Sequence, residues 1–302
     1  MRVAAVDIGT NSTRLLIAEG TAQGLRWIER RAIVTGLGKG VDALAWLSDE
    51  RMDATTAVLQ AYRQAASAAG AERIRAVATS AVRDAVNREV FLGRAEAALG
   101  VRPDLISGDA EARLSFLGAT AELDGEPPYL VIDPGGGSTE FVLGTTEPDF
   151  VTSVDIGSVR LTERSLPSRP SDPLDVVAAS ASVEAMFWAI DLPAAPGTVV
   201  GVGGTYTSLG AIALDLPAYD RLQVHGSVLP LERLTALVGE LAAMTVEETA
   251  AIPSLDPARA PVLLGGAVVA EAALRRSGSD RIVVSEADIL DGIAQELLEE
   301  AS

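Results

Sequence analysis

The sequence predicts an α/β protein built as two domains. Segments of strand character alternate with helical segments along the whole chain, which is typical of layered α/β folds. One short phrase occurs twice, because residues 6–13 (VDIGTNST) return as residues 132–139 (IDPGGGST), 126 positions later. A segment without periodicity, 124–128 (DGEPP), lies between the two halves. With 302 residues the chain is long enough for two ordinary domains.

The first half has clear start and stop signals. Ser48 is a good helix N-cap with two acidic residues directly after it, and Gly70 follows the end of that helix. Gly100 stops the next helix in the same way. The elements that we expect are, in order, strands over 2–6, 13–19 and 24–34, a glycine-rich loop over 36–40, a helix over 48–69, a strand over 73–78, a helix over 87–100, a strand over 103–106 and a helix that opens at 107.

The second half repeats the opening of the first. Two apolar runs again flank a glycine turn, and a third strand follows. An exposed proline-rich loop is expected over 167–173. The remaining expected elements are strands over 129–132, 139–143 and 151–155, a helix over 175–190, a buried strand from 199 that ends in the glycine turn 201–205, a helix over 259–276, a strand over 281–285 and a helix over 287–301.

The domain boundary is placed after residue 124. Proline and glycine in 124–128 interrupt both the helical and the strand pattern, as linkers between domains often do. The expected domains are therefore 1–124 and 125–286, followed by one last helix at 287–302.

The repeated phrase sets one carboxylate beside a turn of small residues in each copy. An aspartate before glycine is often only a turn former, but Asp7 and Asp133 occupy the same place in two copies, which favours a function. Bare N–H groups of such turns bind phosphate, and two turns facing each other would hold a phosphate chain and a metal ion. Glu140 lies two residues past Ser138 on the same strand face, so Asp133 and Glu140 form a candidate carboxylate pair for Mg²⁺.

A third glycine turn, 201–205 (GVGGT), follows a strand in the second half. Glycine-rich turns between a strand and a helix are common, so this turn alone is weak evidence for a binding site. It becomes a candidate because it is the third turn of small residues in the chain. The residues expected to bind phosphate are Gly9, Thr10, Asn11, Ser12, Gly135, Gly136, Gly137, Ser138, Gly203 and Gly204.

Composition excludes several chemistries. The chain has no cysteine and a single histidine, His225, so thiol nucleophiles, zinc-thiolate sites and multi-histidine metal sites are excluded. Any metal site must use oxygen ligands, which favours Mg²⁺, with Mn²⁺ as the other choice. The net charge of −18 argues against nucleic acid and anionic membranes as partners. No leader and no apolar run long enough to span a bilayer are expected, so a soluble cytoplasmic protein is predicted.

Some of the candidate functional residues can also be explained by structure alone. Glu111 lies in the first turn of an expected helix, where a surface carboxylate is favoured by the helix dipole. Arg83 and Arg113 flank the same region and can be ordinary surface residues. His225 can be a buried structural histidine. The glycines of 36–40 lack the spacing of a Walker motif, so P-loop chemistry is not expected.

Taken together, these motifs resemble the exopolyphosphatase/guanosine pentaphosphate phosphatase (Ppx/GppA) family. The resemblance covers nearly the whole chain, in order. Its motifs are residues 5–12 (AVDIGTNS), 37–41 (LGKGV), 78–85 (ATSAVRDA), 106–114 (ISGDAEARL), 132–140 (IDPGGGSTE), 157–163 (GSVRLTE), 201–205 (GVGGT), 225–226 (HG) and 259–260 (RA).

This resemblance implies a fold and roles for single residues. The fold is that of the actin/hexokinase/Hsp70 superfamily, with two ribonuclease-H-like domains around a central cleft and the last helix, 287–302, packed back onto the first domain. The family's catalytic base falls on Glu111 and its phosphate-binding arginine on Arg83. Its metal and phosphate carboxylates fall on Asp133 and Glu140, with Asp7 from the first loop.

The sequence also departs from the family pattern. Pro134 stands where an aliphatic residue is usual, and Ala110 stands where a second acidic residue is common. Near the end, residues 285–292 (SEADILDG) lose an arginine of the usual pattern. The chain resembles the short, two-domain form.

The activity that the resemblance implies is Mg²⁺-dependent release of terminal orthophosphate from inorganic polyphosphate, with a preference for short chains. Guanosine pentaphosphate is the alternative substrate, because the motifs do not separate the two. An actin-like protein that binds ATP as a switch or kinase is an alternative of another class, and a non-catalytic relative is the plainest one. A homodimer is left open.

Overall fold

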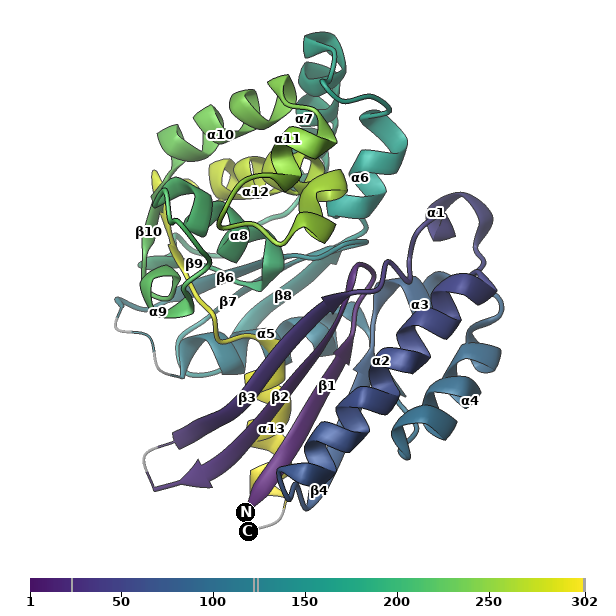
Figure 1. Cartoon of the computed structure of the whole chain (residues 1–302). Helices are drawn as coiled ribbons and strands as arrows, with labels where there is room; N and C mark the ends of the chain where they lie inside the picture. The colour runs from purple at the N-terminus through teal and green to yellow at the C-terminus, as the bar shows by residue number, and fades with distance from the viewer. Residues whose placement is uncertain (23, 122, 124, 301–302) are drawn as a thin grey trace. The chain divides into compact units, whose positions relative to one another are not determined.

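The computed structural model describes residues 1–22, 24–121, 123 and 125–300 (Figure 1). It divides into two compact units, the first formed by 1–118 together with the segment from 287 onward, and the second by 119–286. The expected boundary after residue 124 falls on a residue outside the described ones. The division lies six residues earlier, between residues 118 and 119, near the end of helix α5 (Gly108–Thr120).

The first unit contains a five-stranded sheet in the order β3-β2-β1-β4-β5. β1, β2 and β3 form an antiparallel meander, and β4 and β5 run parallel to β1. This is the strand order of a ribonuclease-H-like domain. The elements are β1 (Arg2–Ile8), β2 (Ser12–Thr21), β3 (Gly24–Val34), α1 (Val41–Leu44), α2 (Asp49–Ala68), β4 (Arg73–Ala78), α3 (Ser80–Asp84), α4 (Arg88–Leu99), β5 (Asp104–Leu105) and α5.

Alternation along β1 sends side chains to two separate cores. Ala4 and Val6 belong to a core that includes α2 and α4, whereas Val3 and Ala5 belong to a core with α13 (Ile289–Glu299). In Figure 1 the yellow helix α13 lies along this sheet. The last helix is therefore part of the first unit.

Helices α5 and α13 approach each other at glycines. A Cβ atom at Gly118 would overlap the carbonyl oxygen of Asp288, and one at Gly292 would overlap that of Leu114. Two glycines thus allow backbone-to-backbone contact, which any larger residue would prevent.

The second unit repeats the plan on a six-stranded sheet in the order β10-β11-β9-β6-β7-β8. β6, β7 and β8 form the antiparallel meander, β9 and β11 follow in parallel, and β10 is added at the edge. Both units therefore confirm the predicted fold class. The strands are β6 (Tyr129–Pro134), β7 (Thr139–Gly144), β8 (Pro148–Val154), β9 (Thr198–Gly201), β10 (Val228–Pro230) and β11 (Arg281–Val284).

More helices cover this second sheet than the sequence predicts. The segments 158–165 and 231–243 are helical, and the glycine turn at 203 opens a further helix. The helices are α6 (Ser158–Ser165), α7 (Pro173–Trp188), α8 (Gly203–Ala213), α9 (Arg221–Val224), α10 (Leu231–Ala243), α11 (Val246–Ala250), the 3₁₀ turn η1 (Pro257–Arg259) and α12 (Ala260–Ser277).

One helical stretch, 257–277, has the length and apolarity needed to cross a membrane, contrary to the expectation from the sequence. Its most apolar window is 67% buried inside the structure. Residues such as Ala267, Val269 and Leu274 are fully enclosed in the core of the second unit. Burial of this kind is typical of the central helix of a globular domain, and the apolarity of α12 is explained by it.

We expect Gly118→Ala to lower the free energy of unfolding by about 3 kcal/mol, because the added methyl group meets backbone that cannot move aside. Gly93→Ala is the matched control, since Gly93 is also helical and a Cβ atom there meets nothing within 4 Å. That control should be neutral or gain up to about 1 kcal/mol from helix propensity. Urea unfolding of both variants measures the difference, and equal stabilities would refute the packing argument.

Candidate functional site

The turn between β1 and β2 closes on itself. The N–H of Gly9 donates to the carbonyl of Ser12 at 3.0 Å. The carbonyl of Thr10 accepts from Gly38 N–H at 2.8 Å, and that of Asn11 accepts from Gly36 N–H at 2.9 Å. Within the described part of the chain, the N–H groups of Thr10 and Asn11 have no protein acceptor. The turn thus has its carbonyls occupied and presents N–H groups, which suits an anion.

The turn between β6 and β7 has the same arrangement. Gly135 N–H donates to the Ser138 carbonyl at 2.9 Å, the counterpart of the Gly9 bond. The carbonyls of Gly135 and Gly136 accept from the first N–H groups of α6, at 2.9 Å from Ser158 and 2.9 Å from Val159. The N–H groups of Gly136 and Gly137 find no acceptor among the residues that the structure describes.

The two hairpins share one register but differ in charge. Asp7 lies opposite Arg14 across β1 and β2, and Asp133 lies opposite Glu140 across β6 and β7. Position 140 is the repeat of position 14, so the first unit has a pair of opposite charges where the second has two carboxylates. Like charges directly opposite each other destabilise a sheet, and a divalent cation bound there would relieve that cost.

Asp7 is part of a buried charge network. Arg14 contacts the Asp7 carboxylate at 2.7 Å and also pairs with Asp288. Arg30 forms an ion pair with Asp288 at 2.6 Å and a second one with Asp291 at 2.8 Å, so it links the two carboxylates. Three strands, β1, β2 and β3, and the start of α13 are held together by these five side chains, so the structure gives Asp7 a role that sequence reasoning missed. Its predicted part in metal binding stays a prediction.

The carboxyl groups of this network respond differently to their surroundings. Burial raises the pKa of Asp7, and Arg14 opposes that change. Burial also acts against ionisation of Asp288, but Arg14 and Arg30 outweigh it, so the pKa of Asp288 lies below its ordinary value. Burial raises the pKa of Asp291. Asp288 is therefore the carboxylate most firmly held as an anion.

The third glycine turn lies directly against Asp133. Gly203 has a φ of +77°, and a Cβ atom there would be 2.5 Å from Asp133 Oδ1. Thr205 Oγ1 donates to the carbonyl of Pro134 at 2.9 Å, which joins the start of α8 to the end of β6. Asp133 and the phosphate turn candidates Gly203 and Gly204 are thus brought together within the second unit.

Arg259 is a residue to which sequence reasoning gave no role. Its guanidinium group lies over the backbone of Gly204, where a Cβ atom would overlap it. The N-terminus of α8 and the arginine together form a positive region next to Asp133. The signal for it was the family motif at 259–260, which was matched without assigning a role to its arginine.

Glu111 and Arg83 are brought together in the first unit. Arg83 Nη1 lies 3.1 Å from Glu111 Oε2 and donates to the carbonyl of Ile106 at 2.9 Å. Both side chains are largely enclosed, with 22% and 14% of their surfaces exposed. This enclosure argues against the reading of Glu111 as an ordinary surface carboxylate. The hydroxyl of Ser80, two residues from the end of β4, is buried with no partner in the described structure.

His225 has a structural contact. Its Nδ1 accepts a hydrogen bond from the N–H of Glu286 at 3.1 Å, and the Glu286 carboxylate receives the hydroxyl of Tyr219. The histidine thus positions the segment that follows β11.

No group of three or more His, Asp or Glu side chains that could hold a metal ion by itself is present among the described residues.

Comparison with known proteins identifies the class. The sequence matches the Ppx/GppA phosphatase family over residues 16–301, so the chain belongs to that family. It is 43% identical to Exopolyphosphatase 2 of Mycobacterium tuberculosis over 98% of both chains. It is also 31% identical to the guanosine-5'-triphosphate,3'-diphosphate pyrophosphatase of Photobacterium profundum, over 83% of this chain and 52% of that protein.

Solved structures agree with the assignment. A crystal structure of an exopolyphosphatase-like protein superposes with a TM-score of 0.95 at 36% identity, over the full length of both chains. The Ppx/GppA protein of Aquifex aeolicus superposes with a TM-score of 0.84 at 32% identity, over 100% of this chain and 99% of that one. The resemblance drawn from the motifs is confirmed.

The contact between Gly203 and Asp133 leads to a prediction. Gly203→Ala and Gly226→Ala should each lose about 1–2 kcal/mol of stability, because both residues have φ near +76°. Only the first should also lower phosphatase activity, by about 10–100-fold, since it displaces Asp133. A Cβ atom at Gly226 meets nothing within 4 Å, which makes it the control. Equal activities of the two folded variants would contradict the role of Asp133.

Proposed function

We propose that this protein is an exopolyphosphatase that releases terminal orthophosphate from inorganic polyphosphate. The single observation that carries the proposal is the pair of closed turns at 9–12 and 135–138. Both have their carbonyls tied to neighbouring segments and their N–H groups presented. The successive phosphate groups of polyphosphate are anions that the N–H groups of two such turns can bind. The 43% identity to a protein named Exopolyphosphatase 2 supports this choice.

A divalent metal fits the residues at the end of β6. Asp133 and Glu140 supply two carboxylates on one face, and Mg²⁺ in phosphate-transfer sites is usually held by one or two carboxylates together with phosphate oxygens. When bound, Mg²⁺ would screen the phosphate charge that develops during transfer. Mn²⁺ has the same ligand preference. We assign this role to Asp133 and Glu140, with Asp7 as the further predicted ligand.

Glu111 is proposed to take the proton of the attacking water. The water oxygen forms a bond to the terminal phosphorus, the anhydride P–O bond breaks, and the shortened chain leaves with the electron pair. Arg83, at 3.1 Å, fixes the orientation of the Glu111 carboxylate and adds positive charge for the phosphoryl group. The turn N–H groups hold the terminal phosphates in place.

We further propose that the protein works in the cytoplasm. The net charge of −18 disfavours binding to nucleic acid and to anionic lipid surfaces. The same charge repels the remote end of a long polyphosphate, so short chains are the proposed substrates.

We expect Glu111→Gln to lower kcat by roughly 10²–10⁴-fold while KM changes little, because general-base assistance has that magnitude. Asp109→Asn is the matched control, since it removes an exposed carboxylate from the same helical turn. Steady-state release of orthophosphate measures both variants. An unchanged kcat for Glu111→Gln would remove Glu111 from the mechanism.

The substrate is tested with a defined panel. Orthophosphate release is measured on short polyphosphate, long polyphosphate, guanosine pentaphosphate and ATP, each with Mg²⁺ and with a chelator. The proposal expects short polyphosphate to have the highest kcat/KM and all release to stop without the metal. Faster turnover of guanosine pentaphosphate would favour the alternative activity, and tight ATP binding without any phosphate release would favour a nucleotide-dependent switch.

A further inference from the structure

Lys39 is the only lysine among the 24 lysine and arginine residues of the chain. Its side chain is exposed to solvent. Within the part of the chain that the structure describes, its amino group has no ion pair and no hydrogen bond. The carboxylate nearest to it in the sequence, that of Asp42, is engaged with another group. Lys39 is therefore a cation without a matching carboxylate in a chain whose net charge is −18.

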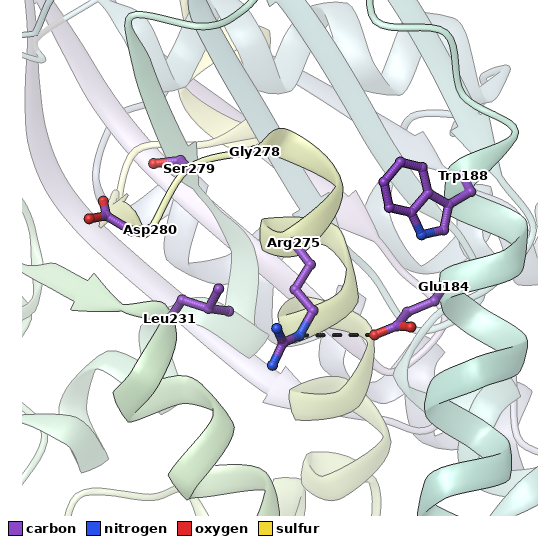
Figure 2. A pocket seen from close by; sticks show the side chains of 7 residues that line it. All are labelled: Glu184, Trp188, Leu231, Arg275, Gly278, Ser279 and Asp280. Atoms are coloured by element: carbon purple, nitrogen blue, oxygen red, sulfur yellow. Dashed lines mark ion pairs between the residues drawn. The ribbon is translucent and has the colours of Figure 1, made fainter.

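Other exposed cations of this chain do have carboxylate partners. Arg102 pairs with Glu89 at 2.7 Å in the first unit. Figure 2 shows an example from the second unit, where Arg275 of α12 lies 3.9 Å from Glu184 of α7. The pocket drawn there measures about 510 Å³ and is lined by Glu184 and Asp280 as well as Arg275, so its charge does not suit an anion. An unmatched cation is thus an exception that the fold itself does not explain.

Thr10, in the turn between β1 and β2, joins two segments that carry basic side chains. Its carbonyl accepts from Gly38 N–H at 2.8 Å, and its hydroxyl accepts from Ala81 N–H at 3.3 Å. Gly38 packs so closely that a Cβ atom there would overlap the Thr10 side chain. Lys39 follows Gly38 directly, and Arg83 lies two residues past Ala81. Both basic residues are therefore anchored beside the same turn.

The backbone around Lys39 is held in place on both sides. Lys39 N–H donates to the carbonyl of Gly36 at 3.1 Å, and Gly36 N–H donates to that of Asn11 at 2.9 Å. After it, Val41 N–H donates to the carbonyl of Gly38 at 3.0 Å. The lysine side chain is a point charge on a flexible four-carbon stem with three donors. A fixed backbone with a flexible cation suits a polyanion whose phosphate groups vary in position.

We propose that Lys39 binds a phosphate group of inorganic polyphosphate beyond the terminal phosphates that the N–H groups of the turn hold. This inference rests on the proposed exopolyphosphatase function. The Lys39 ammonium group donates hydrogen bonds to the phosphate oxygens and offsets part of the repulsion between the substrate and the acidic surface. The contact lies outside the reacting anhydride bond, so it stabilises the bound substrate and the transition state equally. Lys39 therefore lowers KM without changing kcat, and it favours longer chains over tripolyphosphate.

Steady-state release of orthophosphate from polyphosphates of increasing defined length tests this role. Lys39→Ala should raise KM about 3–10-fold, the effect of one exposed charged contact, and leave kcat and thermal unfolding unchanged. The change should be smallest on tripolyphosphate and grow with chain length. Lys39→Arg keeps the charge and should restore KM to within about twofold of the wild type. A KM for Lys39→Ala that equals the wild-type value at every length would overturn the proposal.

Arg102→Ala is the matched control, because it removes one positive charge from the same unit. Asn87 at the start of α4 accepts a hydrogen bond from Leu47 N–H at 3.0 Å, so this end of the helix lies beside the segment that follows Lys39. Arg102 comes after the other end of α4, which is about 18 Å away for a helix of 12 residues. Its KM should match that of the wild type. An equal rise in KM for both variants would show an effect of net charge alone and overturn the proposal.

Salt dependence separates binding from a structural role of Lys39. Each phosphate contact of a cation releases counterions from a polyanion, so Lys39→Ala should reduce the slope of log KM against log salt concentration by about one. A purely structural role would leave that slope unchanged and would refute the contact. A wild-type chain that releases no orthophosphate from any polyphosphate would instead refute the proposed function itself.

The single lysine also allows a direct binding test, because acetic anhydride can acetylate only Lys39 and the amino group of Met1. The Glu111→Gln variant is used so that polyphosphate is bound but hardly consumed. Polyphosphate should slow the acetylation of Lys39 several-fold and leave that of Met1 unchanged, as measured by mass spectrometry of the peptides. Equal acetylation of Lys39 with and without saturating polyphosphate would contradict the proposed contact.

Discussion

The ion pair between Asp7 and Arg14 is the contact on which the first unit depends. It lies near the end of the central strand, directly before the turn at 9–12, and through Asp288 it reaches the N-cap of α13. A buried pair of this kind adds little net stability against an apolar alternative, but it joins facing residues of β1 and β2 and, through Arg14, the start of α13. The turn at 9–12 is therefore held by an element that lies almost 280 residues further along the chain.

The second unit has the same hairpin with a different pair of facing side chains. In the first unit the cross-strand partner of the aspartate is an arginine, so the charge is matched inside the protein. In the second unit the partner is Glu140, and two carboxylates share one face of the sheet. The two hairpins therefore share a backbone arrangement and differ in the charge of one side chain, Arg14 in the first unit and Glu140 in the second.

Local patterns were enough to predict much of this structure. The strands 24–34 and 73–78 have the predicted bounds, and the duplicated turn and the fold class were predicted from the repeat and the motifs. Helices α6 and α10 were missed because no start or stop signal was read in segments 158–165 and 231–243. The ion pair between Arg14 and Asp288 was not predictable, because no pattern along the chain connects these two residues. Long-range ion pairs and close glycine contacts are properties of packing and not of local sequence.

The position of α13 has a consequence for the synthesis of the chain. This helix covers the face of the first sheet formed by Val3, Ala5, Leu16 and Ala18. The ribosome makes α13 only after the whole second unit, so this face of the nascent first unit lacks α13 while 168 further residues, 119–286, are translated. An exposed apolar sheet face is prone to aggregate during such an interval. The first unit can therefore complete this core only after the second unit has been synthesised.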